Sequence, residues 1–347
     1  MPLSRRVIAT ALFGLPVLAA RPASAGEQPV RVYSTTDQPL AQALIDDFER
    51  RHPGLRVEYV ELGSRALYER FLAEGGRMAD VLWSSAMDLQ IKLVNDGHAA
   101  SHESPHARQL PRWAVWKHEA YGTTCEPVGI VYHRHLLAPA ELPRTHAALA
   151  ALLRSDTPRF RGRVATYDIE RAGLGFLIAA HDAMASPLSW ELVRALGACR
   201  AGLHADTLGM LEGVAAGRLL LAYNVLGSYA EAFAKRFPDL GVIYPSDYTL
   251  VTSRVAFVAR QAPNPRGARL WLDHLLSPEG QRLLAEGGGL HAVRTDAAPP
   301  RSALSLARQL GASAWPIALG PGLLACLDRS KRNALLKRWR REFDSSR

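Results

Sequence analysis

The stretch RVYSTTDQPLAQALIDDFERR at residues 31–51 decides the fold class. Its first four residues form a short β-branched and aromatic run that is typical of a strand. From Pro39 to Arg51 the apolar residues recur at helical spacing and define one stripe: Leu40, Ala43, Leu44 and Phe48. The stretch therefore predicts a buried strand followed directly by an amphipathic helix, which is the unit from which α/β folds are built.

The same unit recurs along the chain. Further strands are predicted at 55–62, 79–83, 127–132, 164–167, 219–222, 241–244 and 255–258. Helices are predicted between them, as at 87–96, where Gly97 supplies the end signal, and at 175–185 and 268–276. Alternating strands and helices predict an α/β fold with a mostly parallel sheet.

The order of these units predicts two lobes. We expect a first lobe over 26–125, a second lobe over 126–251, a return to the first lobe over 252–298, and C-terminal helices that pack on the second lobe over 299–347. Residues 101–124, rich in His, Pro and charge, mark the first crossing. Two lobes joined by more than one crossing predict a hinge with a cleft between them.

The N-terminus has the order of a secretory signal peptide. Ser4-Arg5-Arg6 precedes an apolar run over 7–20, and Ala23-Ser24-Ala25 offers a small-residue cleavage site. The run is shorter than the roughly 20 residues of a spanning helix. We expect cleavage after Ala25 and a periplasmic mature protein; export by the general or the twin-arginine route stays open.

The chain is basic, with a formal net charge of +9. Removal of residues 1–25 takes away three arginines and lowers this charge to +6. Much of the excess lies in a C-terminal segment where basic residues alternate with Leu335, Trp339 and Phe343 at helical spacing. The pattern predicts an amphipathic helix with a solvated basic face, and we expect no nucleic-acid partner because no aromatic single-strand platform accompanies it.

Neither cysteines nor motifs indicate an enzyme or a metal protein. Cys125, Cys199 and Cys326 are widely separated, and whether any two form a disulfide stays open. Their spacing does not match a zinc site. No Gly-x-Ser-x-Gly nucleophile motif occurs. We therefore expect no enzymatic activity, no cofactor and no metal.

Polar loops follow several of the predicted strands. In open α/β sheets ligands bind beyond the carboxyl ends of the strands, where helix N-termini offer unpaired backbone amides. Hydroxyls, such amides and a few arginines are typical of a site for a small anion. The predicted ligand-binding residues are Ser34, Thr35, Thr36, Ser64, Arg65, Ser84, Ser85, Arg171, Ala172, Gly173, Tyr223 and Asn224.

Among these residues, Arg171 carries the most specific prediction. If its guanidinium pairs with the anionic group of the ligand, truncation to alanine should weaken binding by roughly ten- to hundredfold. The alternative is a solvated arginine on the loop before a helix.

The segments resemble the extracellular solute-binding proteins of ABC transporters, in the branch of ferric-iron-binding and phosphoglycerate-transport regulatory proteins. The resemblance covers nearly all of residues 30–295. It rests on the segments 32–35, 79–85, 128–132, 163–165 with 173–176, and 276–281, the last reading Leu-Ser-Pro-Glu-Gly-Gln. It implies a two-lobed periplasmic-binding-protein fold, type II-like, that closes about a hinge. It also implies a monomer that delivers a small-molecule ligand to an ABC permease.

One departure from the iron-binding branch bears on the ligand. Those proteins place adjacent tyrosines a few residues after the strand that here ends near Tyr223, because phenolates are hard ligands for ferric ion. This chain has Val225-Leu226-Gly227 there. We therefore expect an organic or phosphorylated acid in preference to ferric iron. A sensory role, in which the closed form signals to a membrane histidine kinase, is the competing function.

Overall fold

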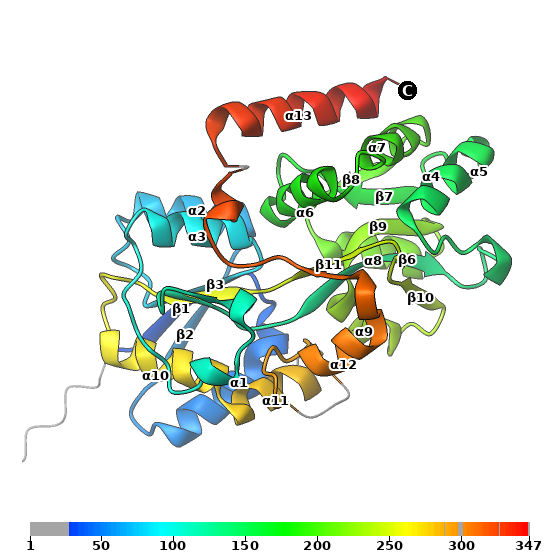
Figure 1. Ribbon diagram of the computed structural model, residues 1–347. Helices are drawn as coiled ribbons and strands as arrows, with labels where there is room; N and C mark the ends of the chain where they lie inside the picture. The colour runs from blue at the N-terminus through cyan, green and yellow to red at the C-terminus, as the bar shows by residue number, and fades with distance from the viewer. Residues whose placement is uncertain (1–27, 288, 298–300, 326, 346–347) are drawn as a thin grey trace, which may run out of the picture.

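The computed structural model describes residues 28–287, 289–297, 301–325 and 327–345. The expected signal peptide and its cleavage site lie outside these residues, as does Cys326. Two α/β lobes lie side by side, one built mainly from the blue, cyan and yellow segments and the other from the green ones (Figure 1). The prediction of a two-lobed α/β fold is confirmed.

The first lobe is built on a sheet with the strand order β2-β1-β3-β12-β5-β4. Its strands are β1 (Val30–Ser34), β2 (Val57–Glu61), β3 (Val81–Ser84), β4 (Val115–Trp116), β5 (Ala120–Gly122) and β12 (Val255–Val258). Strand β1 runs parallel to β2 and β3, whereas β12 is antiparallel to β3 and β5. The expectation of a mostly parallel sheet is therefore wrong for half of this lobe, because β12 returns from the other lobe and enters in the opposite direction.

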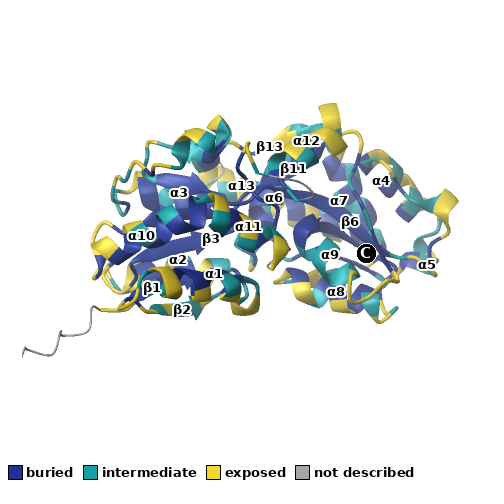
Figure 2. Ribbon diagram, turned by 90° about the horizontal axis from the view of Figure 1, so that it is seen from below, coloured by how far each residue is buried: buried dark blue, intermediate teal, exposed yellow. Residues whose placement is uncertain are grey.

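The helices of the first lobe cover both faces of that sheet, so β1, β3, β5 and β12 are largely buried, whereas the edge strands β2 and β4 are partly exposed (Figure 2). They are α1 (Gln38–Arg51), α2 (Ser64–Ala73), α3 (Met87–Asn95), α10 (Pro265–Leu276) and α11 (Pro278–Glu286). The stripe predicted on residues 39–51 packs inward, with Leu44 and Phe48 fully buried against Trp271 of α10. Burial of such aliphatic and aromatic side chains is the main favourable term in folding the lobe.

The second lobe has the strand order β13-β11-β6-β9-β7-β8, with β10 paired to β6. Its strands are β6 (Glu126–His133), β7 (Val164–Tyr167), β8 (Gly202–His204), β9 (Leu221–Leu226), β10 (Leu240–Ile243), β11 (Thr249–Thr252) and β13 (Ala314–Pro316). Its helices are α4 (His146–Ser155), α5 (Thr157–Phe160), α6 (Gly173–Ala185), α7 (Ser189–Ala198), α8 (Thr207–Ala215), α9 (Gly227–Ala234) and α12 (Ala303–Leu310). This sheet is also mixed, because β6 is antiparallel to β9, β10 and β11.

The C-terminal segment contacts both lobes. The short 3-10 helix at Pro321–Leu324 packs against α3 of the first lobe. The final helix α13 (Arg329–Asp344) then runs along α7 of the second lobe, where Trp339 and Phe343 are buried (Figure 1). The helix has the amphipathic character expected from the sequence. Within the described ranges, none of the helices has the length and apolarity that a membrane span requires.

Candidate functional site

Two of the chain segments that join the lobes run side by side through the middle of the molecule. The segment from β5 to β6 contains Thr123 and Thr124, and the segment from β11 to β12 contains Ser253 and Arg254. The amide of Thr123 donates to the carbonyl of Arg254 at 2.8 Å, and the amide of Arg254 donates to Oγ1 of Thr124 at 2.8 Å. These hydrogen bonds link the two segments, so we treat them as one hinge.

A buried ion pair lies in this hinge. Nε of Arg254 is 3.1 Å from Oε1 of Glu126, and the two side chains are only 2% and 1% exposed. Glu126 also accepts hydrogen bonds from the hydroxyls of Thr124 at 2.7 Å and Ser228 at 2.6 Å. Burial is the largest single effect and would lower the pKa of Arg254, but the interactions with Glu126, Tyr229, Tyr59 and Asp37 together outweigh it, and the pKa is raised. Arg254 is therefore charged and held in place.

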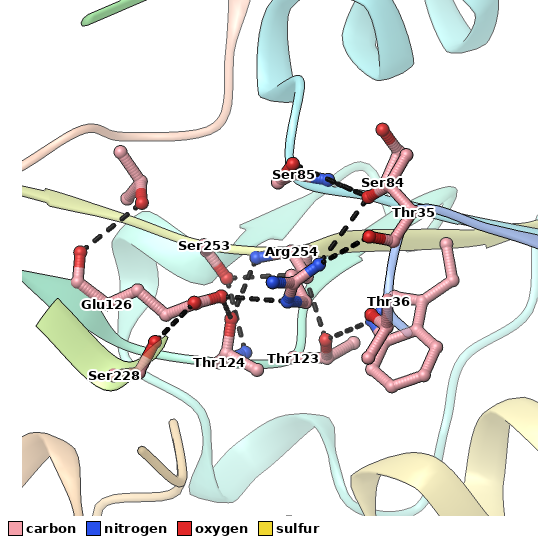
Figure 3. Close-up of polar contacts among 12 residues, drawn as sticks. Thr35, Thr36, Ser84, Ser85, Thr123, Thr124, Glu126, Ser228, Ser253 and Arg254 are labelled. Atoms are coloured by element: carbon pink, nitrogen blue, oxygen red, sulfur yellow. Dashed lines mark hydrogen bonds and ion pairs between the residues drawn. The ribbon is translucent and has the colours of Figure 1, made fainter. Parts of the chain in front are cut away.

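The tip of Arg254 reaches toward both lobes. Nη1 lies 3.3 Å from the carbonyl oxygen of Thr35, at the end of β1, and 3.5 Å from its Oγ1 (Figure 3). The guanidinium carbon lies 5.1 Å from the centre of the Tyr229 ring, on α9 of the second lobe. No hydrogen bond from Nη2 to another described residue is found. Arg254 thus forms part of the cleft surface with hydrogen-bonding capacity left over.

A cleft of about 590 Å³ opens above this arginine, between the lobes. One wall comes from the first lobe: Thr35, Asp37, Glu61, Leu62, Gly63, Ser64 and Ser85. The other wall comes from the second lobe: Tyr167, Ala172, Leu174, Ala205, Asp206, Thr207, Leu208, Gly209, Glu212, Leu226 and Tyr229. Helices α2 and α8 both begin at this cleft, so each brings its N-terminal amides and positive dipole end to it.

Carboxylates line both walls. Asp37 and Glu61 belong to the first lobe, and Asp206 and Glu212 to the second. Glu61 accepts the amide of Gln38 at 2.9 Å, and Asp206 caps α8 by accepting the amide of Gly209 at 2.9 Å. Burial raises the pKa of Asp37, and the charges of Glu61 and Asp206 add to the rise, while Arg254 opposes it. The carboxylates therefore influence one another across the cleft.

The lobes touch beside the cleft. A Cβ atom added at Gly173, the first residue of α6, would lie 2.8 Å from Oγ of Ser64 and 3.2 Å from a methyl carbon of Leu89. Nη1 of Arg65 also donates to the carbonyl of Glu170 at 3.3 Å. Because a side chain at 173 has no room, glycine allows this close approach of the second lobe to the first.

A smaller cavity of about 240 Å³ lies next to this contact. Residues of α2, α3, α6 and α13 enclose it, among them Tyr68, Phe176 and Arg332. Asp88 of α3 faces it and is 2% exposed. Burial raises the pKa of Asp88 to about 7, and the hydrogen bond from the amide of Leu89 and the charge of Arg332 oppose the rise.

The structure brings four of the sequence-predicted site residues to the cleft surface: Thr35, Ser64, Ser85 and Ala172. Arg65 and Gly173 line the smaller cavity instead, together with Ala172, which borders both. Ser34, Thr36 and Ser84 are buried behind the cleft. The hydroxyls of Ser34 and Ser84 accept the amides of Thr36 and Ala86 at 3.0 and 3.2 Å, so they hold the turns after β1 and β3.

Arg171 is placed differently from the expectation. Its side chain is exposed and lines neither the cleft nor the smaller cavity. Its backbone amide donates to Oδ1 of Asp168 at 3.3 Å, within a turn that precedes α6. The sequence correctly places Arg171 on the loop before the helix, but cannot show which way that loop turns its side chain.

Tyr223 and Asn224 also lie outside the cleft. The expected strand end at 222 is wrong, because β9 continues to Leu226 and both residues lie inside it. Asn224, at φ 65°, is the unpaired residue of a β-bulge opposite Gly129 and Ile130. Its Nδ2 and the Tyr223 hydroxyl donate to Asp182 at 2.8 and 2.9 Å in the interior of the second lobe.

Among the cleft residues that were not predicted from the sequence are all of the charged ones: Arg254, Asp37, Glu61, Asp206 and Glu212. One signal was present for Arg254. The polar run Thr252-Ser253-Arg254 directly precedes the apolar strand 255–258 at a crossing between lobes. An arginine at such a crossing must lie near the hinge, and thus near the floor of the cleft.

Comparison with known proteins agrees with this architecture. Residues 30–288 match the family described as bacterial extracellular solute-binding protein, and the chain belongs to that family. A search of curated proteins finds no match. The structure is similar to that of the substrate-binding protein of an ABC transporter from Agrobacterium tumefaciens, with 36% identity, a TM-score of 0.88, and coverage of 92% of this chain and 95% of the other.

More distant structures share the fold. Periplasmic AfuA from Actinobacillus pleuropneumoniae, with fructose-6-phosphate bound, gives a TM-score of 0.77 at 16% identity over 92% of this chain and 99% of its own. Iron-bound HitA from Pseudomonas aeruginosa gives a TM-score of 0.71 at 19% identity, over 90% of this chain and 99% of its own.

In the described part of this chain, no three His, Cys, Asp or Glu side chains are grouped to hold a metal ion. Tyr167 and Tyr229 line the cleft, whereas Tyr223 is bonded to Asp182.

Proposed function

We propose that this protein is the periplasmic binding component of an ABC transporter and closes on a small solute that carries an anionic group. The membership in a family of solute-binding proteins and the likeness to the Agrobacterium protein support the transport role. We propose that Arg254 receives the anionic group, with Thr35, Ser64 and Ser85 from the first lobe and Thr207 from the second completing the site.

The observation that carries the proposal is the position of Arg254. Its guanidinium belongs to the hinge, contacts Thr35 of one lobe and Tyr229 of the other, and borders the cleft. Guanidinium groups recognise carboxylates and phosphates through paired, charge-assisted hydrogen bonds. A ligand bound there touches both lobes at once, and such contacts exist only in the closed state, so binding favours closure.

The proposed site therefore still receives an anion through an arginine, as expected from the sequence, but a different arginine is involved. Arg254 replaces Arg171 because Arg171 is exposed and does not border the cleft. The N-termini of α2 and α8 add backbone donors for an anion, as helix N-termini commonly do.

Delivery to a permease is the remaining part of the proposal. Deletion of the gene in the organism that encodes it should abolish uptake of the solute. Retained uptake with lost induction of the transporter would instead support signalling to a histidine kinase. N-terminal sequencing of the exported protein should begin at Gly26, and a start at Met1 would contradict periplasmic export with cleavage after Ala25.

Native mass spectrometry of the protein purified from its own periplasm tests the ligand assignment. We expect a bound small molecule with an acidic group, at one copy per chain. Titration of this molecule into Arg254→Lys, which retains the charge but loses the planar fork, should show roughly ten- to hundredfold weaker binding. Arg171→Lys is the matched control and should bind normally. Equal affinity of both variants would refute the role of Arg254.

Thr35→Val provides a second variant that leaves both partners of the hinge ion pair in place. It removes a hydroxyl at the cleft that also accepts the amide of Ser85 at 3.0 Å and lies 3.5 Å from Nη1 of Arg254. The affinity should fall by at least about fivefold, the effect of one neutral hydrogen bond. Circular dichroism and the melting temperature establish that each variant is folded before binding is compared.

A further inference from the structure

The cleft carries more negative than positive charge. Four carboxylates line it, from Asp37, Glu61, Asp206 and Glu212, against one guanidinium, that of Arg254. That guanidinium already forms an ion pair with Glu126 behind the cleft. The N-termini of α2 and α8 offset part of the excess, because each is equivalent to roughly half a positive charge. A negative excess remains, and a solute that carries only negative charge does not match it.

The carboxylates also have bonding capacity to spare. Asp206 uses one oxygen to cap α8, and Glu61 uses one to accept the amide of Gln38. The other oxygen of each has no hydrogen-bond partner in the described part of the chain. Asp37 and Glu61 lie on one wall and Asp206 and Glu212 on the other, so the two pairs face the cleft from different lobes.

We propose that the solute is amphoteric: besides its anionic group it carries a basic amine, which the carboxylates of both walls receive when the lobes close. This inference rests on the proposed function and deepens it. Like charges on opposing walls repel as the lobes approach, and an ammonium between them replaces repulsion with charge-assisted hydrogen bonds. Arg254 at the floor and the carboxylates above it would then orient the two ends of the solute.

A set of four matched probes tests the charge requirement. 3-Aminopropylphosphonate carries both charges, propylphosphonate lacks the amine, 3-hydroxypropylphosphonate replaces it with a neutral donor, and propylamine lacks the anion. Calorimetric titration should show that the amino probe binds about tenfold or more tightly than the other three, the usual effect of a hydrogen bond between charged groups.

The outcomes separate this inference from the proposed function. Equal binding of the hydroxy and amino probes would overturn the amine requirement and leave the anion site intact. Propylamine binding as tightly as the amino probe, with no effect of Arg254→Lys, would overturn the anion site itself. Binding of none of the four probes at millimolar concentration would contradict the inference, while native mass spectrometry would still decide the proposed function.

Two isosteric variants identify the carboxylates that are involved. Asp206→Asn keeps the cap of α8, because asparagine is as good an N-cap as aspartate. The Asp37 side chain makes no capping hydrogen bond to α1, so Asp37→Asn removes a charge without the loss of a cap. In the double variant the preference for the amino over the hydroxy probe should fall at least about fivefold. Asp328→Asn, a capping residue of α13 that does not line the cleft, is the control and should leave the preference unchanged. An unchanged preference in the double variant would remove these carboxylates from amine recognition.

Discussion

Charged side chains are buried and paired at the floor of the cleft, but exposed and without cationic partners on its walls. At the floor, Arg254 and Glu126 are almost completely buried and each is the partner of the other. On the walls, Asp206, Glu212 and Glu61 are exposed and have no cationic side chain as a partner among the described residues. A buried charge without a partner is costly, whereas an exposed one is solvated by water. The ion pair at the floor is therefore in place before a ligand binds, whereas the carboxylates on the walls are unpaired and can be neutralised by the ligand.

The largest effect should follow from breaking the pair at the floor. Glu126→Gln leaves the guanidinium of Arg254 buried without its carboxylate. We expect the free energy of unfolding to fall by about 3–5 kcal/mol, the usual cost of removing one partner from a buried pair. Urea denaturation monitored by circular dichroism measures this loss.

A surface pair gives the matched comparison. Arg159 and Glu141 form an ion pair with about a third of each side chain exposed. Glu141→Gln should cost less than about 1 kcal/mol. If the two substitutions cost the same, the distinction between a buried floor and a solvated surface is wrong.

Asp88 tests what happens to a buried carboxyl without a close cationic partner. Its pKa is raised to about 7 from an ordinary value of 3.8, chiefly by burial. Between these values the native state holds the proton and the unfolded state does not, so the free energy of unfolding should rise as the pH falls. From about pH 8 to pH 5 we expect a gain on the order of 2 kcal/mol from this group.

Comparison of the wild type with Asp88→Asn isolates that contribution. The difference in unfolding free energy between the two proteins should change across this pH range, and Asp88→Asn should be the more stable at pH 8. Asp96→Asn, at the exposed end of the same helix, should show no such change relative to the wild type. A pH-independent difference for Asp88→Asn would show that this carboxyl is not held neutral by burial.

The smallest effect is expected at the outer side of the lobe junction. Arg171 is exposed, so Arg171→Ala should change the unfolding free energy by no more than about 0.5 kcal/mol and leave ligand affinity unchanged. Thermal denaturation and calorimetric titration of the co-purified solute measure both. A tenfold loss of affinity would return Arg171 to the binding site and weaken the assignment of Arg254.

The local spacing of apolar residues was sufficient to predict many of the strands and helices. The periodicity of residues 31–51 identifies β1 and α1, and the terminal stripe with Trp339 and Phe343 identifies α13, because each element buries one face and its spacing reveals that face. The antiparallel entry of β12 was not predictable in this way. It depends on the path of the chain between lobes, which leaves no periodic signal.

The site was only partly predictable for the same reason. Thr35, Ser64 and Ser85 reach the cleft because they follow strands or begin helices at the carboxyl edge of the first sheet. Asn224 does not, because a single bulge keeps β9 going and turns its side chain toward Asp182. Arg254 owes its position to Glu126, a contact between residues 128 positions apart, and such a pair cannot be recognised in a single sequence.

The most direct test is a crystal structure of the protein with its co-purified solute. We expect one small molecule between the lobes, with an acidic group in contact with the guanidinium of Arg254 and a second polar group facing the carboxylates of Asp37 and Asp206. A solute bound in the cavity next to Asp88, or a solute held by Arg171 without contact to Arg254, would contradict this expectation.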